Sequence, residues 1–557
     1  MNVFRKDPNL LFVLKQYLDA ELYAWAEQAL DEFGEICGTD IDRRAVHTDR
    51  EGQPRLIRYD RMGHEVSEVW VNEGYRQTVA DTYNRGIVGY IHKEIPELGR
   101  RGGYMYSFAQ GYLLSQVEPG FYCPVTLTMA AAYLLEQYAD ENVKQRFLPH
   151  VLSTGEVPLF EGATFLTERQ GGSDVGANEV RAERAGDVYK LYGEKYFASN
   201  AGMCGVAMVL ARMDGAQPGT KGLSLFAVPW RKDDGAVNGL YIRRLKDKLG
   251  VRAVPSGEVV FEGAEAYLVG DAAKGFYYMM EALNLSRVCN AVASIGIMQR
   301  AFLEAKSYAY QRSAFGKRLA DFPMVRETLA NMAAKQEVET SAVFSILPLF
   351  ERVMLARETV TEDEVAMNRL LIALLKMETA EQAIHFAHEA IELHGGNGYI
   401  EDFVTPRLLR DAQVLTVWEG TANILGLEVL RLLRKYNVHQ TFIAYVRREL
   451  HALPDELAVQ RETVEQAVQR LERMLVALTA MSEDAQTYHC KKVARRMNRI
   501  YESVIALKDA VIGGERKQIL ADLYLRSTWG DADVDIEMLP VAHFDLIMNE
   551  KSRVTAQ

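Results

Sequence analysis

The spacing of apolar residues along this chain changes twice. Up to about residue 160, apolar side chains recur every three or four positions, as in residues 10–18, which predicts amphipathic helices. Between about 160 and 272 the pattern becomes short apolar or alternating runs, such as residues 206–210, separated by Gly, Asp and Pro. Because no helix-length segments separate these runs, they predict an antiparallel β region. From about residue 275 onward the helical spacing returns.

These changes predict a mainly helical α+β chain with four parts. We expect an N-terminal helical domain over residues 1–160 and an antiparallel β domain over residues 161–272. A helical-bundle domain over residues 273–440 and a C-terminal helical extension over residues 441–557 would follow.

Composition narrows the class of protein. The 557 residues are 48% hydrophobic and 25% charged, as in an ordinary globular protein. The net charge of −12 argues against a surface that coats nucleic acid or anionic membrane as a whole. Five scattered cysteines without a CxxC pair favour a reducing compartment and argue against a zinc site. The sequence has neither a signal-peptide pattern nor a run of 18 apolar residues. We therefore expect a cytoplasmic protein with no membrane span.

Common nucleotide and metal motifs are missing. The chain has no G-x-G-x-x-G after a predicted strand and no P-loop, which argues against a Rossmann or P-loop nucleotide site. His385 and His388 lie three positions apart on a predicted helix, but the H-E-x-x-H pattern of metalloproteases is not met. We therefore predict no metal site.

The most informative stretch is residues 417–423, Val-Trp-Glu-Gly-Thr-Ala-Asn. It places the carboxylate of Glu419 beside apolar residues, and apolar surroundings raise the pKa of a carboxyl group toward that of a useful base. Gly420 lets a ligand approach the backbone because it has no Cβ. The alternative is a helix start, with Thr421 as its cap and Glu419 a solvated charge. Taken alone, the stretch leaves both interpretations open.

Three further segments change that balance. They are residues 165–175 (FLTERQGGSDV), 312–319 (RSAFGKRL) and 394–399 (HGGNGY). Together with residues 417–423, in this order and spacing, they resemble the acyl-CoA dehydrogenase superfamily of flavoproteins. The resemblance extends to about residue 436. It implies the acyl-CoA dehydrogenase fold, with an N-terminal helical domain, a central antiparallel β domain and a helical bundle, here followed by an extra C-terminal helical domain.

The resemblance also implies a cofactor, FAD, between the β domain and the second helical domain and extended toward a neighbouring subunit. Arg312 and Phe315 match the pair that reaches the FAD of the adjacent subunit. Phe197 stands where many family members have tryptophan. By matching positions, the residues implied to bind FAD are Leu166, Thr167, Gly172, Ser173, Phe197, Ser199, Arg312, Phe315, Glu392, Gly395, Gly396, Thr421 and Asn423.

In the reaction that the resemblance implies, Glu419 is the base that removes the α-proton of an acyl-CoA thioester while a hydride moves to flavin N5. Ser173, Arg287 and Gly420 match positions that contact the acyl-CoA. The protein would be a homo-oligomer, expected to be a tetramer, acting in fatty acid metabolism and passing electrons to an electron-transfer flavoprotein. An oxidase that uses oxygen instead remains an alternative.

Several departures from the shorter members resemble the AidB-type branch of the family. They include residues 59–66, 123–130 and 244–250, the proline at Pro323, and more than a hundred additional C-terminal residues. The resemblance to this branch implies an alternative function, an adaptive-response flavoprotein that binds DNA or long-chain acyl-CoA with weak or no dehydrogenase turnover.

One helix-spaced basic cluster bears on the DNA alternative. It consists of Lys491, Lys492, Arg495, Arg496 and Arg499, opposite an apolar face formed by Cys490, Val493, Ala494, Met497 and Ile500. The cluster is compatible with phosphate binding to nucleic acid or an anionic membrane. The pattern is more typical of a solvated face on a packing helix, and residues 441–557 contain fewer Lys and Arg than Asp and Glu.

Overall fold

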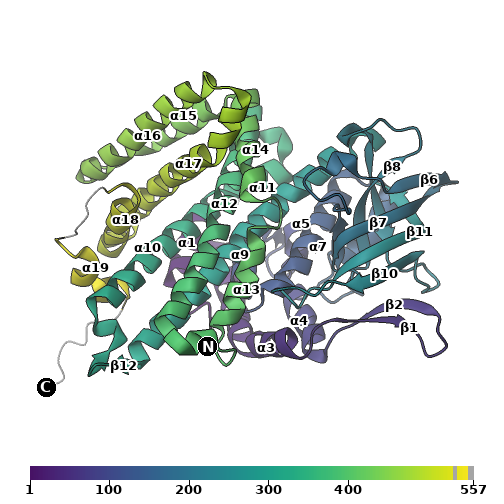
Figure 1. Ribbon diagram of the computed structural model, residues 1–557, viewed down its shortest axis with the longest axis horizontal. Helices are drawn as coiled ribbons and strands as arrows, with labels where there is room; N and C mark the ends of the chain where they lie inside the picture. The colour runs from purple at the N-terminus through teal and green to yellow at the C-terminus, as the bar shows by residue number, and fades with distance from the viewer. Residues whose placement is uncertain (531–535, 550–557) are drawn as a thin grey trace. The chain divides into compact units, whose positions relative to one another are not determined.

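The computed structural model describes residues 1–530 and 536–549. The chain forms two compact units (Figure 1). Unit 1 consists of Met1–Lys6 and Ala20–Cys289, and unit 2 of Asp7–Asp19 and Asn290–Gln557. The finer division into four domains stays a prediction.

The first part of unit 1 is mainly helical, as the apolar spacing predicts. Its helices are α2 (Ala20–Ile36), α3 (Asp42–Arg50), α4 (Glu73–Tyr83), α5 (Gly89–His92), α6 (Gly103–Ser115), α7 (Pro119–Tyr138) and α8 (Glu141–Val151). Every residue of α6 is buried, because this helix carries no charged side chain on any face. The part also contains two short hairpins, β1 (Arg55–Tyr59) with β2 (Glu65–Trp70) and β3 (Glu94–Ile95) with β4 (Arg100–Arg101).

The second part of unit 1 is a seven-stranded sheet. Its strands are β5 (Gly162–Phe165), β6 (Arg181–Ala185), β7 (Val188–Ser199), β8 (Val206–Met213), β9 (Leu223–Pro229), β10 (Leu240–Leu245) and β11 (Ser256–Leu268). Most pairs are antiparallel, as predicted, but β8 pairs in parallel with both β5 and β6. Since β11 pairs with β7 and β9, and β8 with β6 and β9, these five strands close into a ring.

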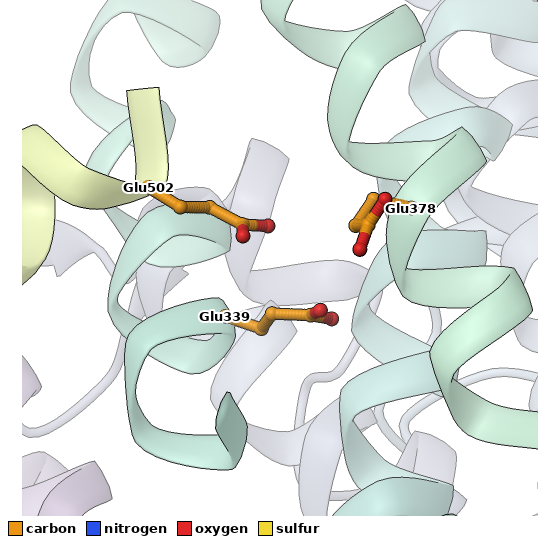
Figure 2. Close-up of side chains that lie close together, drawn as sticks. All are labelled: Glu339, Glu378 and Glu502. Atoms are coloured by element: carbon orange, nitrogen blue, oxygen red, sulfur yellow. The ribbon is translucent and has the colours of Figure 1, made fainter. Parts of the chain in front are cut away.

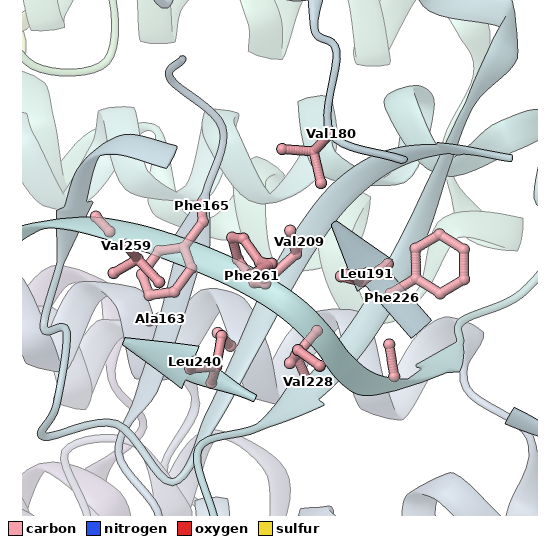
Figure 3. Close-up of a cluster of buried hydrophobic side chains, with 14 of the residues drawn as sticks. Ala163, Phe165, Val180, Leu191, Val209, Phe226, Val228, Leu240, Val259 and Phe261 are labelled. Carbon is pink, nitrogen blue, oxygen red and sulfur yellow. The ribbon is translucent and has the colours of Figure 1, made fainter. Parts of the chain in front are cut away.

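The ring encloses an apolar core. Side chains from several strands meet there, including Phe165, Val209, Phe226, Val259 and Phe261 (Figure 3). All five are almost completely buried. The core therefore gives the β5 and β7 ends, where the unit 1 part of the predicted site lies, a rigid support.

Unit 2 is helical. Its first helices are α1 (Pro8–Tyr17), the second half of α9 (Gly275–Gln311), α10 (Pro323–Ser345), α11 (Leu347–Leu355), α12 (Glu362–His394), α13 (Thr405–Leu415) and α14 (Ala422–Tyr436). A short hairpin of β12 (Ser313–Ala314) and β13 (Lys317–Arg318) follows α9. The N-terminal helix α1 belongs to this unit, and the Lys517 ammonium donates a 2.6 Å hydrogen bond to Asn9.

The C-terminal extension is helical, as predicted. It contains α15 (Val438–His451), α16 (Ala458–Thr479), α17 (Glu483–Ile512), α18 (Gly514–Trp529), α19 (Leu539–Ala542) and α20 (Phe544–Ile547). A single residue, Asn437, ends α14 and begins α15, with a left-handed φ of 49° that asparagine tolerates better than most residues. Among the described residues, no helix is both long and apolar enough to cross a lipid bilayer.

Candidate active site

The unit 1 part of the predicted site forms where the loop after β5 meets the end of β7. The backbone N–H of Tyr196 donates to the carbonyl of Thr167 at 2.9 Å, and the Lys195 ammonium donates to the carbonyl of Leu166 at 3.2 Å. The structure thus brings Leu166 and Thr167 next to the strand residues that precede Phe197. These positions are 30 residues apart in sequence, and their proximity fits the prediction that they contact one ligand.

A buried ion pair that the sequence analysis missed supports this junction. The Lys195 ammonium lies 2.7 Å from a carboxylate oxygen of Glu168, and Lys195 is fully buried. Glu168 also accepts hydrogen bonds from the backbone N–H groups of Glu179 and Val180. Burial lowers the pKa of Lys195, and the adjacent Glu168 only partly offsets this effect. The sequence held one signal of this burial. Alternate residues of a strand share a face, so Lys195 lies on the same face of β7 as Leu191.

Phe197 and Ser199 occupy the exposed end of β7. The Phe197 ring is 52% exposed, although it is a large apolar group on a strand of a well-packed sheet. The Ser199 hydroxyl lies 3.3 Å from the Ser256 hydroxyl on β11. The Lys246 ammonium lies 4.7 Å from the centre of the Phe197 ring, and the exposed part of the ring beside hydroxyl groups offers a stacking surface and hydrogen bonds to a flat polar ligand.

The remaining predicted residues of unit 1 differ in exposure. Gly172 and Ser173 are exposed in the loop that follows Thr167. A Cβ at Gly172 would lie 2.5 Å from the Thr167 hydroxyl, so glycine is needed for this close approach. Arg287, by contrast, is buried on α9 and its guanidinium donates to Asn284 at 3.0 Å.

In unit 2, Glu419 lies in the short loop between α13 and α14. Its side chain is half-buried, and its φ of 61° is left-handed, which is uncommon for a residue other than glycine. The preceding turn is tight, because the N–H groups of Val417 and Trp418 both bond to the carbonyl of Val414 at 2.9 Å. Strained backbone of this kind is concentrated at functional sites.

Thr421 and Asn423 lie at the N-terminus of α14, directly after this loop. Thr421 occupies the N-cap position, but its side chain makes no capping hydrogen bond. The capping role considered from the sequence is therefore not performed by the hydroxyl. Both side chains are exposed, and the N–H groups of the first helical turn face a position suited to an anion such as phosphate.

A second group of predicted residues surrounds the hairpin after α9. Its two-residue turn consists of Phe315 (φ 50°) and Gly316 (φ 82°), a turn with two left-handed residues that fits a tight hairpin. Phe315 is 97% exposed at the tip, and Arg312 at the base is also exposed. An aromatic side chain so exposed is suited to contact another molecule.

The loop after α12 lies beside this hairpin. Tyr308, four residues before Arg312, stacks on His394 with ring centroids 4.2 Å apart and accepts a hydrogen bond from Asn397 at 3.0 Å. The adjacent Glu392, Gly395 and Gly396 are exposed, and a Cβ at Gly396 would meet no atom within 4 Å. Tyr308 is a supporting residue that the sequence motifs did not reveal.

The predicted residues of unit 2 therefore form two groups. Glu419, Gly420, Thr421 and Asn423 form one, and the hairpin with the loop after α12 forms the other. The α12 residue that contacts Gly420 is Lys376, which precedes His394 by 18 positions, or roughly 27 Å of helix. One small ligand group cannot contact both groups, whereas an extended dinucleotide, or two of them in an oligomer, can.

Away from these groups, unit 2 contains a buried cluster of three glutamates. Among the described residues, only Glu339, Glu378 and Glu502 have the spacing of a possible metal site, and their carboxylates point toward one another (Figure 2). The Lys335 ammonium lies 2.9–3.0 Å from all three. Burial lowers the pKa of Lys335, but the three carboxylates outweigh this and raise it well above its ordinary value. A lysine therefore supplies the positive charge there.

The basic cluster of the C-terminal extension lies on α17. Its apolar face is buried, as predicted. On the basic face, the Arg495 guanidinium contacts both carboxylate oxygens of Glu381 on α12 at 3.0 Å. Lys492 and Arg499 remain exposed. The charge of this face is thus partly compensated within unit 2.

Three family models match the chain. The N-terminal domain of the adaptive response protein AidB matches residues 1–155. The middle domain of acyl-CoA dehydrogenase matches residues 163–264, and its C-terminal domain matches residues 273–433.

Known proteins resemble the chain over most of its length. Acyl-CoA dehydrogenase family member 11 of Caenorhabditis elegans is 32% identical over 531 residues, covering 91% of this chain and 84% of the relative. Putative acyl-CoA dehydrogenase AidB of Escherichia coli strain K12 is 32% identical over 420 residues, covering 74% of this chain and 75% of the relative. The crystal structure of Caenorhabditis elegans ACDH-11 in complex with C11-CoA has a TM-score of 0.88 and 28% identity, covering 99% of this chain and 96% of that one.

These matches confirm both the resemblance drawn from the four motifs and the predicted fold class. The order of the three matched domains is the order of helical, β and helical regions seen along the chain. The chain belongs to the acyl-CoA dehydrogenase family, in its AidB-type branch.

Proposed function

We propose that the chain is an FAD-dependent acyl-CoA dehydrogenase in which Glu419 removes the α-proton of an acyl-CoA thioester. The observation that carries the proposal is the left-handed backbone conformation of Glu419 just before the N-terminus of α14. The chain that contains it belongs to the acyl-CoA dehydrogenase family. This conformation places Glu419 in the short loop directly before the N-terminus of α14, where a ligand phosphate or thioester could bind beside it. The α-proton moves to the Glu419 carboxylate, and the backbone N–H of the same residue is placed to hold the thioester oxygen as charge develops on it.

The residues present fit FAD. The exposed ring of Phe197 offers a stacking surface, and Ser199 offers a hydroxyl for the edge of the flavin. The N-terminus of α14, with the uncapped Thr421 and nearby Asn423, suits a phosphate. In unit 1, Leu166, Thr167, Gly172 and Ser173 would contact the flavin beside Phe197 and Ser199. When bound, FAD supplies the acceptor for the hydrogen leaving the β-carbon, while the protein supplies alignment and the base.

The proposal includes a homotetramer in which the second group of residues serves a neighbouring subunit. The exposed Phe315 and Arg312, with Glu392, Gly395 and Gly396, would contact the FAD held by that subunit. An arginine fork suits a pyrophosphate because it can donate to two oxygens at once. Electrons would then pass to an electron-transfer flavoprotein, the acceptor that the family resemblance implies.

The substrate class is an acyl-CoA thioester. Support comes from the family membership and from the Caenorhabditis elegans structure, which contains C11-CoA. Ser173, Arg287 and Gly420 would contact the thioester or the CoA moiety. Release of peroxide in place of electron transfer would identify an oxidase.

An anaerobic titration with acyl-CoAs of graded chain length tests this function. Loss of flavin absorbance is expected for at least one chain length. Glu419→Gln should bind the same ligand but reduce the flavin roughly 10²–10⁴-fold more slowly, since a positioned base contributes that much. The exposed Glu362→Gln is the matched control. If no chain length bleaches the flavin while Glu419→Gln binds ligands as the unmodified protein does, the dehydrogenase proposal is wrong.

A second candidate function is DNA binding by an AidB-type flavoprotein. The observation that favours it is the basic surface on α17, where Lys492 and Arg499 are exposed. It predicts affinity for duplex DNA that falls steeply with salt and weakens when Lys492 and Arg499 are neutralised. Absence of binding at low salt would rule out this function and leave the dehydrogenase proposal untouched.

A further inference from the structure

A buried lysine contacts the loop that carries the proposed base. Lys376 lies in the middle of α12 and is 1% exposed. Its ammonium donates a 2.7 Å hydrogen bond to the backbone carbonyl of Gly420, the residue after Glu419. Burying an ammonium group is unfavourable unless it is paired or hydrogen-bonded, so this contact is a specific feature of the site.

The loop needs such support because of its conformation. Glu419 and Gly420 both have positive φ, 61° and 102°, and they lie next to each other in the short connection between α13 and α14. An L residue such as glutamate rarely adopts this conformation without outside support.

The loop is held on both sides of Glu419. On the N-terminal side, the buried Asn290 on α9 donates to the carbonyl of Leu415, the last residue of α13, at 3.1 Å. On the C-terminal side, Lys376 holds the carbonyl of Gly420. Both donors come from long helices that are packed in unit 2 and do not belong to the loop itself.

We infer that Lys376 is a positioning residue, which fixes the backbone of Glu419–Gly420 and so the direction of the Glu419 carboxylate toward the substrate α-carbon. The inference rests on the proposed function for the role of Glu419. The rate of proton transfer depends steeply on the distance between the base and the proton, so a loop displaced by about 1 Å can slow the reaction roughly 10²-fold. Replacing Lys376 should slow the chemical step and leave acyl-CoA affinity unchanged, because this buried side chain contacts the loop and is not expected to contact the ligand.

A simple structural role makes a different prediction. If Lys376 only stabilised the packing of α12, its removal would lower stability and reduce FAD content and ligand affinity together. A positioning role instead lowers the rate of the chemical step at unchanged acyl-CoA affinity. It also loosens the backbone around Gly420 more than the rest of unit 2.

The test compares Lys376→Met with Lys435→Met, which removes a lysine from the surface of α14. Two measurements are made on each FAD-loaded full-length protein. The first is the rate constant of flavin reduction at saturating acyl-CoA together with the dissociation constant of that acyl-CoA. The second is backbone hydrogen exchange in the peptide covering residues 413–424, which needs no turnover. For Lys376→Met we expect roughly 10- to 100-fold slower reduction, unchanged affinity and faster exchange in that peptide.

The outcomes separate the inference from the function on which it rests. If the exchange and the reduction rate of Lys376→Met both equal those of the unmodified protein, the inference is wrong and the proposed function still stands. A parallel loss of affinity, FAD and stability overturns it in favour of a structural role. If no acyl-CoA reduces the unmodified protein, the proposed function fails, and the exchange measurement still decides whether Lys376 fixes the loop.

A second variant keeps the test decisive if Lys376→Met does not fold. Lys376→Gln removes the buried charge and shortens the side chain, so that it no longer reaches the Gly420 carbonyl as the ammonium does. We expect slower reduction at unchanged affinity and faster exchange in residues 413–424. Unchanged values in this variant overturn the inference.

Discussion

The phenolic hydroxyl of Tyr83 donates a 3.0 Å hydrogen bond to the carboxyl group of Glu161, just before strand β5. Glu161 is only 5% exposed. Burial raises the pKa of Glu161 to about 7, and the bond from Tyr83 only partly opposes this. The carboxyl group therefore titrates near neutral pH, far from its ordinary range.

We predict that this group makes unit 1 less stable as the pH rises. The folded protein binds the proton of Glu161 more tightly than the unfolded chain does, so its contribution is complete below about pH 4.5 and is lost as the pH rises through about 7. The full change is about 3 kcal/mol. Urea unfolding of the protein and of Glu161→Gln between pH 4.5 and 8 measures it. The variant should show a flatter profile; the same slope in both proteins would contradict the prediction.

The Lys335 cluster predicts a large stability change in unit 2. Lys335→Met would leave Glu339, Glu378 and Glu502 buried without the ammonium group that contacts all three. Removing one partner of a buried ion pair destabilises by roughly 3–5 kcal/mol. Denaturant unfolding should show this loss. A second substitution, Glu339→Gln, should restore part of it, because burial and the neighbouring carboxylates already raise the pKa of Glu339 well above its ordinary value.

The exposed hairpin predicts a loss of FAD binding that depends on assembly. Arg312→Ala should lower FAD affinity roughly 10- to 100-fold if its guanidinium binds a cofactor phosphate, as hydrogen bonds to charged groups contribute about 1.5–3 kcal/mol. Lys317→Ala, in the same hairpin, is the matched control. Flavin content after dialysis, with sedimentation to measure the oligomer, tests this. Equal loss in both variants would indicate a general charge effect and not a specific contact.

The sequence predicted the features that depend on local pattern. Helical and strand spacing gave the order of elements, and residues 417–423 identified a carboxylate at a helix start, where the structure places Glu419 just before α14. It could not predict that β5 and β6 pair in parallel with β8, because strand pairing between distant segments has no local signature. Nor did any local pattern indicate that α1 would join unit 2.

The supporting residues were missed for a different reason. Lys376 is a single charge within an apolar segment, and Lys195 follows Glu194 in a strand where polar and apolar residues alternate, so the spacing of apolar residues does not show that either lysine is buried. Their roles depend on partners 27 and 44 residues away, Glu168 and the carbonyl of Gly420. Only the tertiary structure shows that these lysines are buried and where their donors point.

The closed ring of strands has a consequence for the order in which unit 1 folds. Because β11 pairs with β7 on one edge and β9 on the other, the ring cannot close until Ser256–Leu268 is present. Pairing between distant segments is slow, since chain entropy is lost before the contacts form. During synthesis, the surface that carries Thr167 and Phe197 therefore remains incomplete for about a hundred residues of chain after the first of them has emerged, and capture of the proposed cofactor must wait for β11.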